Sequence, residues 1–385
     1  MHPPPDPQTL SGLCVVLATA ALSAEDLRRT VAALERRGVE LFAQRDLAAA
    51  HHPDLPADFA TEGATALIGF NPMICPGAAP GTRYPHPSID NAVYHLGMIL
   101  GPARHHLRVA ADGRLADRIA RALLPQRQLE TLQARIAKRR VDIATTDRVI
   151  ASLSRHKHRA KVELVEWNGR KAVRKTFRAT AGRAMENEQA FHDDIAPLSP
   201  VPARILRRTD NALYFEYIEP QPHRRVLGRK LPRLLPLTVV RELADFARLV
   251  TSRGWDPIDL TPRDNVLIEA GTGALRCIDF EFATRGTEPV PVDQAAFLCG
   301  LAPDAPAADM FDAGMRQDPY PGKWRPFTGL SRHSLLHDPA WMQHLKRATL
   351  HPPWLIGRAL GAPGRRRAHL RERAEILEAL ALRES

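Results

Sequence analysis

Long apolar runs and closely spaced cysteines are both missing from this sequence. No apolar stretch reaches the roughly 18 residues that a membrane-spanning helix needs, so we expect no transmembrane segment. The 4 cysteines lie far apart and do not form the paired spacing of a zinc site. Buried thiols in a reducing compartment are the simplest explanation, which favours a cytoplasmic protein. The cysteines are Cys14, Cys75, Cys277 and Cys299.

A cleaved signal sequence is not expected either. Residues 12–22 are apolar enough to resemble the core of one, but no Lys or Arg precedes them and Asp6 does. A first β-strand explains this run better. The 33 prolines are spread through the chain, which argues against wholesale disorder.

Acidic residues are too few to balance the basic ones. The chain has 54 Lys and Arg against 43 Asp and Glu, a formal net charge of +11. Such a surface favours anionic partners such as nucleotides, phosphosugars, acidic glycans or membrane headgroups. A solvated arginine-rich surface is an equal alternative. No nucleic-acid-binding motif accompanies the charge, so we expect no nucleic-acid partner.

The first part of the chain alternates between short apolar strands and helices, which predicts a small α/β domain over 1–115. This part has no glycine-rich phosphate loop. Its neighbouring histidines, His105 and His106, are more typical of an exposed loop than of a site. Strands are expected at 13–19, 39–42 and 64–70, with a helix over 24–37 capped by Ser23 and another from Ser88 to about Leu100.

Residues 116–148 are highly charged and contain no glycine, and apolar side chains from Leu123 to Ile136 recur at roughly helical spacing. We predict a long linking helix here, docked on a neighbouring domain or pairing between chains. A solvent-exposed connector is an equal alternative.

The pattern changes to strand-like alternation from about residue 149. The apolar alternation of 160–167, the pair Asn168-Gly169 and a second strand over 170–177 predict a β-hairpin. Lys175 lies near the end of the second strand. A helix over 184–195 containing Glu188 follows, and then strands over 203–208 and 212–218.

Two polar motifs lie further along the chain. Residues 259–265 read Asp-Leu-Thr-Pro-Arg-Asp-Asn, and residues 278–281 read Ile-Asp-Phe-Glu after a short apolar strand. The carboxylate of Asp279, in the Ile-Asp-Phe-Glu motif, is costly to bury unless it is paired or binds a metal.

In their order and spacing these parts resemble the protein kinase-like superfamily, which includes the aminoglycoside, choline and lipopolysaccharide kinases. The resemblance covers about 147–300. It implies an α+β fold class, with a two-lobed kinase-like domain preceded by the small α/β domain and the linking helix. That domain would span 149–385, with an N-lobe over 149–219 and a C-lobe over 220–385.

The resemblance also implies a nucleotide site. Lys175, held by an ion pair with Glu188, would reach the α- and β-phosphates of ATP. The phase of the helix favours Glu188 over its neighbour Glu186, because Phe191 and Ile195 share its face. Glu216 and Ile218, on the strand that would join the two lobes, would contact the nucleotide.

By the same resemblance, the downstream motifs carry the chemistry. Asp259 would be the catalytic residue that accepts or orients the proton of the substrate hydroxyl. Asn265 and Asp279 would hold Mg²⁺, which prefers hard oxygen ligands. Asp293 resembles an aspartate that opens a buried helix and braces the catalytic loop.

The expected glycine-rich loop before Lys175 is missing. The corresponding turn, 154–160, carries Arg155, Lys157 and Arg159 instead. These basic side chains and the backbone amides of the turn could still meet phosphates. Simple solvation of a basic turn is the alternative.

The catalytic loop also departs from the family. Pro257 stands where a histidine is usual, and Asn265 lies six residues after Asp259 rather than five, where Asp264 stands. Either the loop has one extra residue and Asn265 is the metal ligand, or Asp264 is. The apolar run that follows Asn265 favours the first.

The metal motif ends in Glu281, where protein kinases carry glycine. This form is common in the branch that acts on small molecules and sugars. No Ala-Pro-Glu segment follows, and only about 14 residues separate Asp279 from Asp293, which leaves little room for a peptide-binding platform.

Two C-terminal segments are distinctive. Residues 320–346 are rich in Trp, Arg, His and Pro and could line an acceptor site, or pack in a helical core. Residues 358–383 suggest a pair of basic helices that follows the glycines of 361–364. These helices could contact acidic lipid or be solvated.

We therefore expect an ATP- and Mg²⁺-dependent kinase acting on a hydroxyl of a sugar, glycan or other small molecule, and the basic balance of the chain fits an anionic acceptor. A Ser/Thr protein kinase and a pseudokinase that serves as a nucleotide-binding or scaffold module are the alternatives. The residues do not indicate the acceptor, the oligomeric state or the task of the N-terminal domain.

Overall fold

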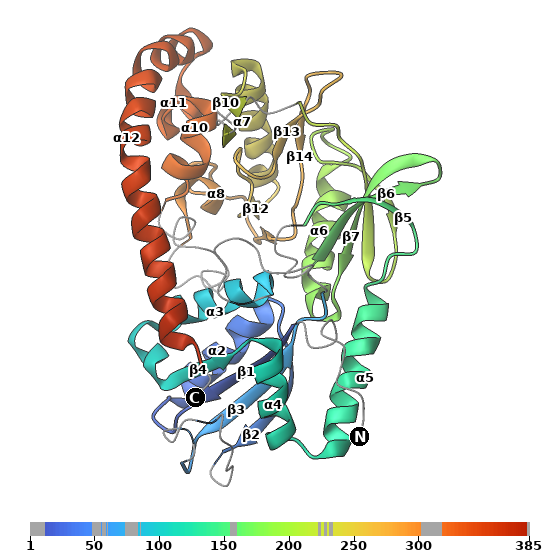
Figure 1. Ribbon diagram of the computed structural model, residues 1–385. Helices are drawn as coiled ribbons and strands as arrows, with labels where there is room; N and C mark the ends of the chain where they lie inside the picture. The colour runs from blue at the N-terminus through green and yellow to red at the C-terminus, as the bar shows by residue number, and fades with distance from the viewer. Residues whose placement is uncertain are drawn as a thin grey trace. The chain divides into compact units, whose positions relative to one another are not determined.

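The chain folds as two units, each with its own core (Figure 1). Unit 1 comprises Met1–Glu163, Thr176–Ala181 and Arg367–Ser385, and unit 2 comprises Leu164–Lys175 and Gly182–Arg366. This computed structural model describes residues 12–47, 55, 59, 61–73, 84, 86–154, 160–221, 225–226, 229–230, 234–301 and 318–382. The expected α+β character is present, with helices and several separate sheets.

Unit 1 contains a four-stranded sheet in the order β2-β3-β1-β4, in which all neighbours are antiparallel. Its central strand β1 pairs Val15 with Ile68 on one side and with Ala110 on the other. Every side chain of β1 is apolar and buried, which requires cover on both faces. The strands are β1 (Leu13–Ala18), β2 (Glu40–Asp46), β3 (Thr65–Phe70) and β4 (Leu107–Ala110).

Helices cover both faces of this sheet (Figure 1). Apolar side chains of α2 (Ala24–Arg36) and α3 (Pro87–Leu100) pack on one face, together with the last turns of α12 (Ala340–Leu380). Those of α4 (Gly113–Leu123) and α5 (Gln126–Asp142) pack on the other.

Capping explains where two of these helices begin. Ser23 accepts a hydrogen bond from the backbone N–H of Asp26 at 3.0 Å, which confirms it as the N-cap of α2. The next helix, α3, begins at Pro87 rather than at a cap on Ser88. Proline suits a first helical position because the N–H that it lacks would have no partner there.

The single linking helix that we expected over 116–148 is wrong. The chain forms two helices, α4 and α5, because Pro125 forces Leu124 into an extended conformation with φ −111° and ψ 133°. The second helix ends at Asp142, before strand β5 (Arg148–Ser152). Neither helix is a solvated connector, since the apolar side chains that suggested a helix are buried against the sheet.

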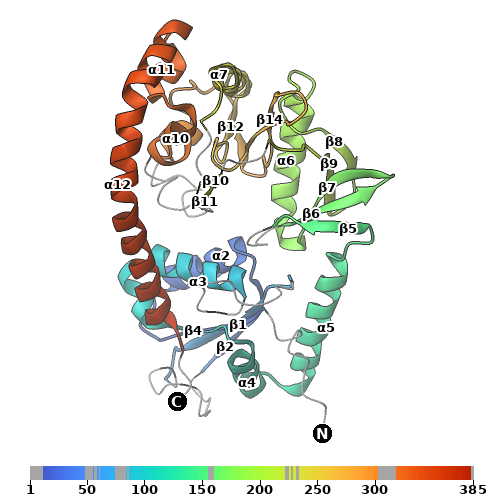
Figure 2. The same ribbon diagram turned by 45° about the horizontal axis from the view of Figure 1, so that its top comes forward.

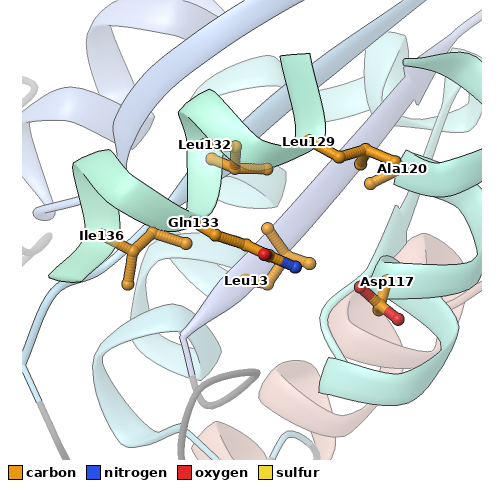
Figure 3. Close-up of a pocket in the computed structure, with 7 residues that line it drawn as sticks. All are labelled: Leu13, Asp117, Ala120, Leu129, Leu132, Gln133 and Ile136. Carbon is orange, nitrogen blue, oxygen red and sulfur yellow. The ribbon is translucent and has the colours of Figure 1, made fainter. Parts of the chain in front are cut away.

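A small cavity of about 20 Å³ lies between α4, α5 and β1 (Figure 3). Leu129, Leu132 and Ile136 of α5 line it with Leu13 of β1, and Asp117 and Gln133 lie at its margin. A space of this size holds about one water molecule and is far too small for a substrate or cofactor.

A five-stranded sheet has the order β5-β6-β7-β9-β8. The predicted hairpin is present: β6 (Ala160–Trp167) and β7 (Arg170–Phe177) are joined by Asn168 and Gly169. Both turn residues have positive φ, 50° and 71°, as a tight two-residue hairpin turn requires. Helix α6 (Gly182–Ile195) lies beside the sheet in both views (Figures 1 and 2), and β8 (Ile205–Arg208) and β9 (Ala212–Glu216) follow it.

The remainder of unit 2 is built around a larger apolar core. Helix α7 (Leu237–Ser252) packs there with two short antiparallel pairs, β12 (Trp255–Pro257) with β15 (Ala283–Arg285) and β13 (Val266–Ile268) with β14 (Leu275–Cys277). Short elements complete the unit: β10 (Arg225–Val226), β11 (Arg229–Lys230), α8 (Ala296–Cys299), a π-helical turn Tyr320–Trp324, α10 (Arg325–Thr328) and α11 (Arg332–His337).

Helix α12 is one continuous helix of 41 residues, so the helix pair that we expected over 358–383 is wrong. Pro352, Pro353 and Pro363 lie inside it without ending it. Its final turns belong to unit 1, where Arg373 pairs with the buried carboxylate of Asp90 on α3. No helix in the described part of the chain is both long and apolar enough to cross a bilayer.

The contact between α3 and the end of α12 leads to a first prediction. A methyl group at Gly97 would collide with the buried side chain of Ile376, so Gly97→Ala should lower the free energy of unfolding by about 1–3 kcal/mol. Gly357→Ala is the matched control. It lies on an exposed turn of α12 with nothing nearby, and the better helix propensity of alanine should stabilise the chain by up to about 1 kcal/mol. Thermal unfolding followed by circular dichroism measures both, and equal stabilisation by the two variants would contradict this packing.

Candidate functional site

A buried lysine in unit 2 faces three carboxylates. The ammonium Nζ of Lys175 lies 2.7 Å from Oε2 of Glu188, 2.6 Å from Oδ1 of Asp279 and 3.0 Å from Oε2 of Glu281. The side chains of Lys175, Glu188 and Glu281 are almost fully buried, whereas that of Asp279 is 40% exposed. We call these four residues the Lys175 cluster. It joins β7, α6 and the segment between β14 and β15.

The charges of the Lys175 cluster do not balance, because one ammonium group serves three carboxylates. Burial acts to lower the pKa of Lys175, but attraction from Asp279, Glu188 and Glu281 outweighs it and holds that pKa well above its usual range. Burial raises the pKa of Glu188, and repulsion from Asp279 and Glu281 adds to the rise against the attraction of Lys175. Among these four side chains, negative charge therefore exceeds positive charge.

The chemistry of the donor set suits a divalent cation. Glu188, Asp279 and Glu281 each offer an oxygen atom within 4.8 Å of the others. Carboxylate oxygens are the hard ligands that Mg²⁺ prefers. Asp279 is the most exposed of the three and the best placed to share an ion with a bound molecule.

Local structure explains why Glu188 faces Lys175. It lies on the buried face of α6 with Phe191 and Ile195, whereas Glu186 points to solvent. The geometry thus agrees with the choice of Glu188 over Glu186 made from helical phase. The second oxygen of Glu188, Oε1, accepts the backbone N–H of Phe280 at 3.3 Å.

Asp279 is held in an unusual backbone conformation. Its φ is +67°, which is strained for a residue other than glycine and persists only where the surroundings enforce it. The next residue supplies that enforcement, because Phe280 is buried and stacks on Phe191 with ring centroids 4.0 Å apart. Strain of this kind is concentrated at functional sites.

The β13–β14 hairpin brings the end of the 259–265 motif beside Asp279. Val266 pairs with Cys277, and the backbone N–H of Ile278 donates to the carbonyl of Asn265 at 3.0 Å. Asn265 and Asp279 therefore lie at the same end of this hairpin. The amide Nδ2 of Asn265 donates to the backbone carbonyl of Asp259 at 2.8 Å, which ties the 259–265 loop to the hairpin.

The geometry favours Asn265 over Asp264 as a metal ligand. Asn265 is 5% exposed and lies beside Asp279, whereas the Asp264 side chain is 44% exposed and 4.0 Å from the ammonium of Lys323. The same ammonium lies 3.8 Å from Oδ1 of Asp259. A cation from the π-helical turn thus stands at the carboxylate expected to be catalytic.

Two residues on the strand β9 and just after it, Glu216 and Ile218, were expected to contact the nucleotide. The carboxylate of Glu216 pairs with Arg276 on β14 and accepts the backbone N–H of Arg204 at 2.8 Å. It therefore braces the strands instead of being offered to a ligand. Ile218 is buried just after β9 and is apolar, as a contact to a base would require.

One expected structural role belongs to a different residue. Asp293 is exposed, and it is Asp256 that braces the helix, since its Oδ2 accepts the backbone N–H of Ala296 at 2.7 Å at the start of α8. Burial raises the pKa of Asp256, against the hydrogen bonds from Ala296 and Phe297. The basic side chains of the turn before β6, Arg155, Lys157 and Arg159, lie outside the described residues.

Sequence reasoning missed the part played by Glu281 and Lys323. A signal for the first was present, because Asp279 and Glu281 are two carboxylates only two residues apart in one motif. Lys323 could not have been singled out, because it lies 64 positions beyond Asp259 in a segment without a motif.

No known protein family matches this chain in a scan of family models, and no curated protein matches it significantly.

Removing the ammonium of Lys175 should destabilise the fold. In Lys175→Met the three carboxylates would lose the ammonium group that faces them in a largely buried space, and we expect the free energy of unfolding at pH 7 to fall by about 3–5 kcal/mol. Lys171→Met, the same change at an exposed position of β7, should cost less than about 1 kcal/mol. Urea unfolding measures both. If Lys175→Met were no more costly than its control, the cluster would not be a buried ion network.

A second prediction concerns His192, which packs among Phe191, Phe215 and Phe280. Neither of its ring nitrogens has a hydrogen-bond partner among the described residues. Burial, with the nearby charges of Lys175 and Arg208, lowers its pKa from 6.5 to about 4 against the attraction of Asp193.

Because the folded state binds the His192 proton less tightly than the unfolded state, its contribution to stability is lost as pH falls from 6.5 towards 4. We expect the free energy of unfolding of His192→Phe, relative to that of wild type, to be about 2 kcal/mol more favourable at pH 5 than at pH 7. Urea unfolding at the two pH values measures this difference. The raised pKa of Glu188 acts in the opposite direction, but it is common to both proteins and cancels in the difference. Identical pH profiles for the two proteins would show that His192 is accessible to protons in the folded state.

Proposed function

We propose that this chain is an ATP-dependent phosphotransferase with a two-lobed protein-kinase-like domain, acting on a hydroxyl group of a sugar, glycan or other small molecule. The observation that carries this is the Lys175 cluster, in which a strand lysine meets both a helix glutamate and the aspartate of the Ile-Asp-Phe-Glu motif. Phosphoryl transfer depends mainly on alignment and charge neutralisation, and these side chains provide both.

Each residue has a part in this proposal. Lys175 would bind phosphate oxygens of ATP while Glu188 holds its ammonium in place. Asp279 and Asn265 would hold Mg²⁺, which when bound neutralises charge on the phosphates. Asp259 would orient the acceptor hydroxyl and take up its proton.

A small anionic acceptor fits the surroundings of Asp259 best. Lys323 contributes an ammonium group beside this carboxylate. Arg358 donates to the carbonyl of Pro321 in the same turn as Lys323, and repulsion from Arg365 and Arg263 adds to the lowering of its pKa by burial. Guanidinium groups in the segments next to the expected catalytic residue would attract a phosphate or carboxylate on the acceptor.

A protein substrate is less favoured than a small molecule. Only the short strand β15 and the start of α8 lie between Asp279 and Cys299, so little chain is available there to hold a peptide.

A nucleotide-binding scaffold without turnover is the second candidate. The specific observation in its favour is that Lys175 is already engaged by three carboxylates, whereas the scheme above needs only Glu188 to hold its ammonium. Bound phosphates would have to compete with Glu281 for the ammonium.

ATP hydrolysis and transfer can be measured on the full chain with Mg²⁺ and a panel of sugars, sugar phosphates and other hydroxyl compounds. Asp279→Asn and Asn265→Ala should each lower kcat by roughly 100-fold or more, because each removes a ligand for the metal ion. Asp245→Asn, at an exposed site on α7, should have wild-type activity.

The outcomes separate the candidates. Thermal stabilisation by ATP and Mg²⁺ without turnover on any acceptor would favour the scaffold. Full phosphotransfer by Asp279→Asn would refute the metal role of Asp279. Phosphorylation of generic protein substrates but of no small molecule would favour a protein kinase.

A further inference from the structure

The first part of α12, residues 340–366 in unit 2, exposes large apolar side chains to solvent. Trp341 is 64% exposed, Leu345 55%, Ile356 61% and Leu360 78%. Side chains of this size and number on one helix are unusual for a surface that faces only water.

These four side chains form a single stripe. They are separated by four, eleven and four residues, each close to a whole number of helical turns. At 1.5 Å per residue the stripe is roughly 28 Å long. Such spacing is typical of a helix whose one face is meant to be covered.

Part of the opposite face of the same helix is packed, although Leu350 on that side is 56% exposed. Trp354 lies on that side, with the guanidinium of Arg325 4.6 Å and that of Arg358 5.6 Å from its ring centroid, and His351 stacks on the ring. The helix is thus held to α10 and the π-helical turn by one side, and the apolar stripe is turned away from them.

The charge around the stripe has one sign. Residues 339–371 contain no Asp or Glu, although about one residue in nine of the whole chain is acidic. Seven Lys and Arg lie in the same span, and Arg365 and Arg366 are exposed. The partner that covers this face must therefore be both apolar and negatively charged.

We propose that this face of α12 binds an anionic lipid surface, with the helix lying in the plane of the interface. An amphipathic helix with Trp and Leu on one side and Arg or Lys beside it inserts its apolar side chains at the level of the headgroups. Basic residues near the surface add attraction to anionic lipids. Nucleic acid would match the charge but not the apolar stripe, and an apolar protein surface would match the stripe but not the charge. The binding is independent of the phosphotransferase activity proposed above.

The test uses the full chain and vesicles of two compositions, phosphatidylcholine alone and phosphatidylcholine with phosphatidylglycerol. Wild type should sediment with the anionic vesicles and not with the neutral ones, and high salt should weaken this binding. The double variant Leu345→Glu/Ile356→Glu should bind the anionic vesicles at least roughly tenfold more weakly, because it places two charges in the apolar stripe.

Two further variants separate insertion of the stripe from the effect of adding charge anywhere on the surface. Leu198→Glu changes an equally exposed leucine, 53%, outside α12 and should bind like wild type. Arg365→Glu/Arg366→Glu leaves the stripe intact and should also lose binding, because the attraction to anionic lipid is reversed. Circular dichroism checks that each variant is folded, and if the first double variant fails to fold, the arginine variant decides.

Several results would overturn the proposal. Wild type that binds neither kind of vesicle, or binds both equally, would exclude an anionic lipid surface. If Arg365→Glu/Arg366→Glu bound the anionic vesicles as tightly as wild type does, an anionic lipid surface would also be excluded. If wild type forms dimers that Leu345→Glu/Ile356→Glu dissociates, and no vesicle binds, the stripe is an interface between two copies of the chain.

Discussion

The ammonium group of Lys175 is the interaction on which the rest of unit 2 depends. It draws carboxylates from α6 and from the segment after β14 to the end of β7, three elements that are far apart in the sequence. Burying so many charges together is costly unless they are paired, and a network short of positive charge is stable only with a proton or a cation. The same excess of carboxylates underlies our proposal that the cluster binds a metal ion and an anionic ligand together.

Apolar packing determines the precise position of these charges. Phe280 is held by Phe191 and by the buried core around α7, so the neighbouring Asp279 must take a left-handed backbone conformation. The β13–β14 hairpin then places Asn265 at the same end, and Asn265 in turn binds the backbone at Asp259. A site built in this way is rigid because the residues that hold it are not themselves reactive.

Unit 1 is organised differently. Its antiparallel sheet is covered by helices on both faces, and the cavity beside α5 has room for little more than a water molecule. Its described residues contain no cluster of potential metal ligands. The polar groups that it does bury, such as Asp90 with Arg373, hold helices together. The chemistry that we infer for this chain is therefore concentrated in unit 2.

The local patterns of the sequence determined several elements and the identity of the main polar residues. The hairpin at Asn168-Gly169, the N-cap at Ser23 and the choice of Glu188 over Glu186 could be predicted because each follows from short-range geometry. The pairing of Glu188 with Lys175 was implied by the resemblance. Tertiary structure alone decided the rest. Asp256 takes the bracing role expected of Asp293, and Glu281 and Lys323 join the site. These contacts depend on which distant segments the core brings together, and no local periodicity carries that information.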